Sequence, residues 1–160
     1  MDRDDNLLVE QFPPQRRQLR VAMVTETFAP EVNGVAMTLG RLVAGLRRRG
    51  HAVQLVRPRQ HTDEAPSRDP RFEELLSSGL PIPNYPGLRF GLPAKGTLTR
   101  LWSRDRPDVV HVATEGPLGW SAVAAARKLK LPVSSGFHTN FDSYSRHYGI
   151  GWLKGSISRY

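Results

Sequence analysis

The fold follows from residues 19–50, which read LRVAMVTETFAPEVNGVAMTLGRLVAGLRRRG. The stretch opens with a short apolar run, residues 19–24, whose β-branched members predict a buried strand. A polar segment follows as far as Gly34, where apolar residues begin to recur at spacings of three and four, the pattern of a helix face. Three arginines and then Gly50 end the stretch. Positively charged side chains suit the negative, carboxyl end of a helix, and glycine suits the left-handed residue beyond it.

The rest of the chain continues this alternation of strands and helices. Further strands are expected at 52–56, 108–113 and 133–137, and further helices at 97–104 and 119–130. Pro58 is expected to stop the second strand. Residues 59–94 hold many prolines and are expected to be irregular, apart from one strand near 88–90. The alternation favours an α/β fold, a Rossmann-like open parallel sheet with helices on both faces.

The domain organisation is expected to be simple. Residues 1–18 are polar and predict a flexible lead-in, followed by one domain over 19–160. Residues 151–160 look like the start of a helix with no stop signal behind it. Because open sheets of this kind normally continue through further strand–helix units, we expect the domain to be incomplete and the chain to be part of a longer protein.

Composition limits the kinds of chemistry and of partner. The chain has no cysteine, which removes disulfides, thiolate zinc sites and cysteine nucleophiles. Lys and Arg number 23 against 15 Asp and Glu, and the net charge of +8 favours phosphate-bearing partners. No apolar run approaches the roughly 18–20 residues of a membrane span, and the first residues lack the features of a signal peptide. A cytoplasmic protein is therefore expected.

A ligand site is expected at one edge of the sheet. In open parallel sheets, ligands bind beyond the carboxyl ends of the strands, and residues 25–34, 113–119 and 136–144 reach that edge. Gly34 opens the first helix, where the backbone can approach a ligand and free N–H groups favour an anion. An ordinary turn glycine is the alternative interpretation of Gly34.

Three further residues are expected in or near this edge, of which Glu115 and His138 are candidates for the site. Glu115 ends the third predicted strand and is a site candidate, although it could instead stabilise the start of the next helix. His138 directly follows a strand and can donate to a sugar hydroxyl or a phosphate oxygen; a loop histidine without a role is the alternative. His111 lies inside a strand and is expected to be packed and satisfied. We expect Gly34, Glu115 and His138 to meet at a common rim.

Several other functions are disfavoured by motifs that the sequence lacks. It contains no G-x-G-x-x-G, no G-x-x-x-x-G-K-[ST] and no G-x-S-x-G motif, which argues against a dinucleotide-binding dehydrogenase, a phosphate-loop hydrolase and an α/β-hydrolase. No His, Asp and Glu residues show metal-ligand spacing, so no metal site is expected. The arginines are scattered and not interleaved with aromatic residues, which argues against nucleic acid as a partner.

Four stretches, residues 20–35, 48–53, 106–112 and 136–144, together resemble the amino-terminal domains of family 4 glycosyltransferases, which have the GT-B fold. The likeness runs over nearly the whole chain and is strongest to bacterial lipid-directed mannosyl- and glucosyltransferases and to sulfoquinovosyl transferases. It implies the acceptor-side half of an enzyme that transfers a hexose with retention from a nucleotide sugar such as GDP-mannose or a UDP-hexose. It also implies that no cofactor and no metal are needed.

The resemblance also implies roles for individual residues. Gly34, with Asn33 beside it, would lie against the donor diphosphate, although the family often has two glycines at these positions. His138 would contact the transferred sugar. The acceptor pocket would be lined by residues that the resemblance places on the same side, namely Glu26, Glu115, Thr139 and Tyr144.

The partners implied are the nucleotide-sugar donor and a sugar or lipid acceptor. Arg47, Arg48 and Arg49 are expected to approach an anionic membrane, which suggests a peripheral position on its inner face; a solvated helix end is the alternative. Most donor contacts in such enzymes come from a second domain, so this chain alone is expected to be inactive. A nucleotide-sugar epimerase of similar fold and a non-enzymatic basic binding module remain as alternatives.

Overall fold

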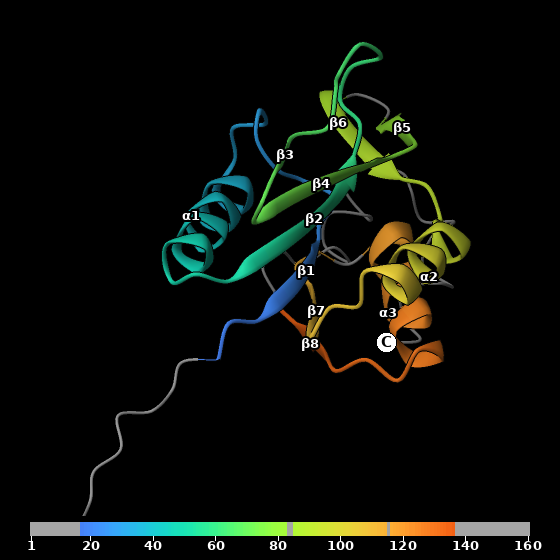
Figure 1. Ribbon diagram of the computed structural model, residues 1–160. Helices are drawn as coiled ribbons and strands as arrows, with labels where there is room; N and C mark the ends of the chain where they lie inside the picture. Colours follow the sequence, from blue (N-terminus) through green and yellow to red (C-terminus); the bar gives the residue numbers. More distant parts are fainter. Residues whose placement is uncertain (1–16, 83–84, 115, 137–160) are drawn as a thin grey trace, which may run out of the picture.

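The computed structural model describes residues 17–82, 85–114 and 116–136 (Figure 1). Its strands are β1 (Arg20–Val24), β2 (Ala52–Pro58), β3 (Arg68–Asp69), β4 (Phe72–Ser77), β5 (Gly79–Ile82), β6 (Tyr85–Gly91), β7 (Val109–Val112) and β8 (Val133–Ser135). Its helices are α1 (Gly34–Arg48), α2 (Lys95–Arg104) and α3 (Pro117–Lys128). No helix among these residues is long and apolar enough to cross a lipid bilayer.

Six of the strands form one sheet in the order β3-β4-β2-β1-β7-β8. All neighbouring pairs are parallel except β3 and β4, which are antiparallel. In the centre, Val24 of β1 lies opposite Val56 of β2 and Val112 of β7, so β1 and β7 end level with one another while β2 continues to Pro58. This arrangement confirms the predicted α/β fold with an open, mostly parallel sheet.

Helices cover both faces of the sheet (Figure 1). On one face, Leu39 and Val43 of α1 pack with Met23 in the middle of β1. On the other face, α2 and α3 pack with Ala22 and Val24 of the same strand. Because both faces of β1 are buried, its sequence is a continuous apolar run and does not alternate with polar residues.

The ends of α1 match the capping signals of its sequence. Asn33 is the N-cap, and its Oδ1 accepts a hydrogen bond from the N–H of Ala36 at 2.8 Å. At the other end, Gly50 adopts a φ of 85°, and its N–H donates to the carbonyl of Arg47 at 2.9 Å. A residue with a Cβ is strained in this left-handed conformation, so glycine is required here.

The prediction of irregular structure over residues 59–94 was wrong. This region contains β3 to β6 and the start of the turn that leads to α2. The strand expected near 88–90 is part of β6, which pairs antiparallel with β5 in a separate two-stranded sheet. A two-stranded sheet consists of edge strands alone, where a missing proline N–H costs little, and this is why Pro81 and Pro86 are tolerated within it.

Smaller differences concern the ends of elements. Pro58 is the last residue of β2 and does not lie beyond it, and β8 ends at Ser135, two residues before the predicted end. The helix start predicted over 151–160 lies outside the described residues.

Candidate functional site

The candidate site lies at the carboxyl edge of the sheet, where two of the three predicted segments are shown side by side. The N–H of Thr25 donates to the carbonyl of Val56 at 3.0 Å, and that of Glu26 donates to Thr114 Oγ1 at 2.6 Å. The segment that follows β1 is thereby attached both to β2 and to the segment that follows β7. The third segment begins at the same edge, because the N–H of Gly136 donates to the carbonyl of Val112 at 3.1 Å.

Gly34 is the first residue of α1 at this edge. A Cβ at this position would have no neighbour within 4 Å. The position that a side chain would occupy at Gly34 is therefore not filled by any described residue. No positive φ and no close contact accounts for a glycine at this position.

Asn33 holds the loop before α1 in place. While its Oδ1 caps the helix, its Nδ2 donates to Thr27 Oγ1 at 2.7 Å and lies 3.4 Å from Glu31 Oε2. The hydroxyl of Thr27 donates in turn to the carboxylate of Glu31. The side chain of Asn33 is therefore committed to the fold of its own loop, which fixes the direction from which a ligand can reach α1.

Glu26 lies beneath the rim, with only 6% of its surface exposed. Its Oε1 accepts a hydrogen bond from the N–H of Leu118 at 3.1 Å, and its Oε2 accepts one from the N–H of Gly91. Leu118 belongs to the first turn of α3, so this carboxylate occupies the positive end of that helix. A Cβ at Gly116 would overlap the same carboxylate, which is why glycine precedes α3.

The electrostatics of Glu26 are dominated by its burial. Burial raises the pKa of Glu26 to about 7, although hydrogen bonds from the N–H groups of Gly91, Leu118 and Gly119 act to lower it. The negative charge of Glu31 adds to the increase. Near neutral pH the group therefore exists in both protonation states, inside a contact that joins β1, β6 and α3.

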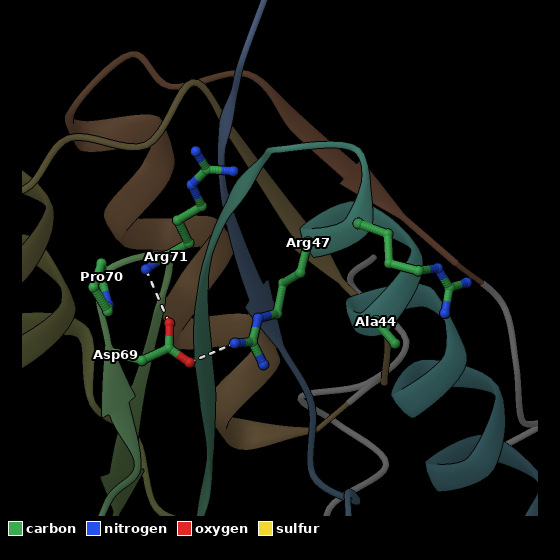
Figure 2. Close-up of a pocket in the computed structure, with 6 residues that line it drawn as sticks. Ala44, Arg47, Asp69, Pro70 and Arg71 are labelled. Carbon is green, nitrogen blue, oxygen red and sulfur yellow. Dashed lines mark hydrogen bonds and ion pairs between the residues drawn. The ribbon is translucent and has the colours of Figure 1, made fainter.

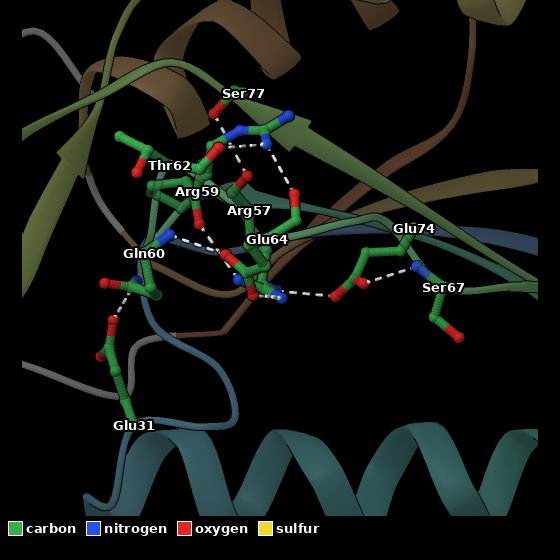
Figure 3. A network of polar contacts seen from close by, with 10 residues as sticks. Glu31, Arg57, Arg59, Gln60, Thr62, Glu64, Ser67, Glu74 and Ser77 are labelled. Atoms are coloured by element: carbon green, nitrogen blue, oxygen red, sulfur yellow. Dashed lines mark hydrogen bonds and ion pairs between the residues drawn. The ribbon is translucent and has the colours of Figure 1, made fainter.

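A polar network links the loop before α1 to the loop after β2 (Figure 3). Arg57, only 4% exposed, forms ion pairs with Glu64 and with Glu74, the latter at 2.7 Å. The N–H of Gln60 donates to Glu64 Oε2 at 2.8 Å, and the Gln60 side-chain amide donates to Glu31. Two loops of the candidate site are thus tied to one buried cation at the end of β2.

Two carboxylates of this network have opposite pKa shifts. Burial alone would raise the pKa of Glu64, but hydrogen bonds from Arg57 and from the N–H of Gln60 outweigh it and hold this pKa below its usual range. Burial raises the pKa of Glu31, and there the hydroxyl of Thr27 and the charge of Arg57 do not compensate fully. This network leaves no signal in the sequence, since its members are separated by irregular spacings and several of them lie in the proline-rich segment 59–94.

The remaining predicted residues have different outcomes. His111 lies within β7, and its Nδ1 is 2.9 Å from Ser134 Oγ on the neighbouring strand β8. Glu115, His138, Thr139 and Tyr144 lie outside the described residues, so the meeting of Glu115 and His138 with Gly34 stays a prediction. In the part of the chain that the structure describes, no three His, Asp or Glu side chains are grouped so that they could hold a metal ion.

The geometry provides one wall of a site with an open helix start. Asn33 takes the N–H of Ala36, which leaves the N–H groups of Gly34 and Val35 and the positive dipole end of α1 to face an anion. The first turn of α3 is instead taken by Glu26. The wall can therefore receive a negatively charged group at α1, with polar loops on either side of it.

Comparison with known proteins identifies relatives of the chain. The family described as Glycosyltransferase Family 4 matches residues 32–160. A GDP-mannose-dependent alpha-mannosyltransferase of Mycobacterium tuberculosis is 34% identical over 140 residues, covering 82% of this chain and 35% of that protein. An alpha-monoglucosyldiacylglycerol synthase of Streptococcus pneumoniae is 27% identical over 135 residues, covering 84% of this chain and 30% of that protein. The chain spans about a third of the length of these relatives.

Proposed function

The chain belongs to glycosyltransferase family 4, and we propose that it forms the acceptor-side half of an enzyme that transfers a hexose from a nucleotide sugar to a sugar or lipid acceptor. The proposal includes retention of configuration at the transferred sugar. A second domain supplies the opposite wall of the cleft and most contacts to the nucleotide. The relatives named for GDP-mannose and for glucosyldiacylglycerol support a nucleotide-sugar donor and a lipid among the candidate acceptors.

The open first turn of α1 is the observation that carries this proposal. Sugar transfer leaves negative charge on a departing diphosphate, and backbone N–H groups aimed at that charge lower the barrier. Gly34 leaves room for the diphosphate to approach these groups, and Asn33 fixes the loop beside them.

The other roles follow the family resemblance. His138 contacts the transferred sugar, and Glu115, Thr139 and Tyr144 line the acceptor pocket. Glu26 belongs to the same side of the cleft, and its hydrogen bonds to Gly91 and Leu118 support a role in shaping the floor of that pocket.

A lipid acceptor requires that the enzyme reach a membrane. Arg47, Arg48 and Arg49 at the exposed end of α1 form a patch that approaches the anionic inner face of the membrane, where each charge contributes about 1 kcal/mol. The enzyme is then peripheral to the membrane on its cytoplasmic side.

The function can be tested by replacing the corresponding third of the M. tuberculosis relative with this chain and measuring the release of GDP from GDP-mannose. We expect acceptor-dependent transfer. Gly34→Val should lower kcat/KM for the donor on the order of a hundredfold, because it displaces the diphosphate from α1.

Gly40→Val is the matched control for this test, since Gly40 is also in α1 and a Cβ there would also have no neighbour within 4 Å. Equal activity of the two variants would contradict the role of Gly34. An inactive but folded replacement enzyme would contradict the transferase function itself, and conversion of the nucleotide sugar without an acceptor would favour an epimerase.

A further inference from the structure

A second hollow lies at the opposite edge of the sheet, where α1 ends and β4 begins (Figure 2). Its volume is about 520 Å³, within the range of small-molecule sites. It is lined by three arginines, one carboxylate and two small apolar residues, namely Arg47, Arg48, Arg71, Asp69, Ala44 and Pro70. Val53 of β2 pairs with Phe72 of β4 near the amino ends of both strands. The hollow therefore lies at the amino edge of the sheet, opposite the carboxyl edge where the candidate site lies.

One of the three arginines is held in place by the fold. Arg47 forms an ion pair with Asp69, and its guanidinium carbon lies 5.0 Å from the centre of the Phe72 ring. Such a stacked, ion-paired guanidinium loses little freedom when a further anion binds to it. Figure 2 shows Arg47 entering the hollow from α1, with Asp69 between it and Arg71.

The single carboxylate of the hollow is already engaged. Asp69 Oδ2 contacts Arg47, and Asp69 Oδ1 accepts a hydrogen bond from the backbone N–H of Arg71 at 2.9 Å. Among the ion pairs formed by the described residues, neither Arg48 nor Arg71 has a carboxylate partner. The residues that line the hollow therefore carry three positive charges against one negative charge.

The carbonyl groups at the end of α1 do not offset this charge. The N–H groups of Arg49, Gly50 and His51 donate to the last carbonyls of the helix, those of Gly45, Leu46 and Arg47. These bonds satisfy the acceptors that would otherwise repel an anion from a helix end. The local field is therefore set by the arginines.

We propose that this hollow is a second ligand site, which binds a phosphate ester through Arg47, Arg48 and Arg71. Guanidinium groups match the oxygens of a phosphate with paired hydrogen bonds. A phosphate alone does not fill 520 Å³, and the methyl of Ala44 and the ring of Pro70 provide a surface for the organic part of the ligand. The ligand is either a soluble phosphate ester or the headgroup of an anionic lipid.

Arg49 provides a matched control for this site. It lies at the same helix end and is exposed, but its guanidinium approaches Gly45, where a Cβ would lie 3.4 Å from Arg49 Nη1, and it does not line the hollow. Arg49→Gln therefore removes the same charge from the same region without changing the site. Binding is measured without sugar transfer, so the outcome is independent of the proposed activity.

The first experiment titrates the chain with glycerol 3-phosphate and follows the backbone amide signals of Asp69 and Arg71 by NMR. We expect saturable shifts, with binding about threefold weaker in Arg48→Gln and in Arg71→Gln and unchanged in Arg49→Gln. Arg71→Lys keeps the charge but loses the paired geometry, and we expect an intermediate affinity. Circular dichroism checks that each variant is folded.

The second experiment separates the two sources of the phosphate. Vesicles of phosphatidylcholine with 20% phosphatidic acid are sedimented with the wild type and the same variants. A greater loss of sedimentation in Arg48→Gln and Arg71→Gln than in Arg49→Gln identifies the lipid headgroup, because Arg49 contributes only its charge to membrane attraction and does not line the hollow. Saturable glycerol phosphate binding without any sedimentation identifies a soluble ester.

Two results would overturn the proposal. The first is the absence of saturable binding to both probes. The second is an equal loss of binding in Arg49→Gln and the two lining variants, which would indicate a diffuse charged surface with no defined site.

Discussion

Glu26 is the residue whose ionisation is most closely linked to the structure. Its pKa is about 7 in the folded chain, above the usual value of 4.5, because burial disfavours the charged form. The folded state therefore binds this proton more tightly than the unfolded state. The resulting stabilisation is complete below about pH 4.5 and is lost as the pH rises to about 7.

We expect the free energy of unfolding to fall on the order of 3 kcal/mol from this group across that pH window. Urea unfolding of the wild type and of Glu26→Gln at a series of pH values measures the effect. The variant should lack this part of the pH dependence. It should also be less stable at low pH, because glutamine offers only one acceptor oxygen to two N–H donors. An equal change with pH in the free energy of unfolding of the wild type and of Glu26→Gln would contradict the expectation.

Gly116 provides a second prediction at the scale of the residue. Gly116→Ala places a Cβ against the enclosed Glu26 carboxylate, and we expect a loss of about 1–3 kcal/mol in the free energy of unfolding. Gly34→Ala is the control, because the space around Gly34 is open and alanine favours a helix. Chemical denaturation should therefore separate the two variants, and an equal loss in both would count against the packing described.

At the scale of elements, some strands and helices leave a pattern within their own sequence, whereas others depend on contacts with distant residues. β1 and α1 were predictable because a buried strand and an amphipathic helix each leave a local pattern of apolar residues. β4, with the sequence FEELLS, has no such pattern, since Glu73 and Glu74 interrupt it and Glu74 is stabilised by Arg57 from β2 and by the N–H of Ser67. β5 was missed, and β6 was predicted only near 88–90, because prolines normally indicate loops and only the pairing of the two strands with each other makes them a sheet.

The Arg57 network joins β2, β4 and the loop between them. Its removal should therefore lower the stability of this part of the fold. Arg57→Gln leaves the half-buried carboxylates of Glu64 and Glu74 without their buried cation, and we expect a loss of about 3 kcal/mol in the free energy of unfolding. Arg104→Gln removes an ion pair to Asp105 whose arginine is 71% exposed, and it should leave the denaturation midpoint unchanged. A midpoint shift of similar size in both variants would contradict the importance of burial.

At the scale of the whole molecule, the sequence predicted the location of the candidate site better than its internal contacts. The convergence of the segments after β1 and β7 followed from the expectation that parallel strands end at one edge of the sheet, and it is confirmed by the bond between Glu26 and Thr114. The position of Glu26 beneath the rim was not predictable, since its partners Gly91 and Leu118 are 65 and 92 residues away along the chain. Contacts of that separation are set by packing and leave no local pattern.

The chain alone is expected to bind a nucleotide sugar weakly and to transfer no sugar, because one wall of a cleft neither excludes water nor orients the donor. Incubation of the purified 160-residue chain with GDP-mannose or UDP-glucose and a diacylglycerol acceptor, followed by assay of the released nucleotide, tests this expectation. Acceptor-dependent release above the level of a heat-denatured sample would contradict it.

The contact of Glu26 with main-chain N–H groups has a consequence for sequence variation. Every amino acid except proline supplies the donor that Leu118 supplies, so the side chain at this position can change while the bond persists. Gly91 is less free, because a Cβ there would lie 2.7 Å from Leu118 Cβ and 2.9 Å from Glu26 Oε2. Relatives that keep the glutamate should therefore lack proline in place of Leu118, should keep an apolar side chain there because Leu118 is fully buried in the core, and should retain glycine in place of Gly91.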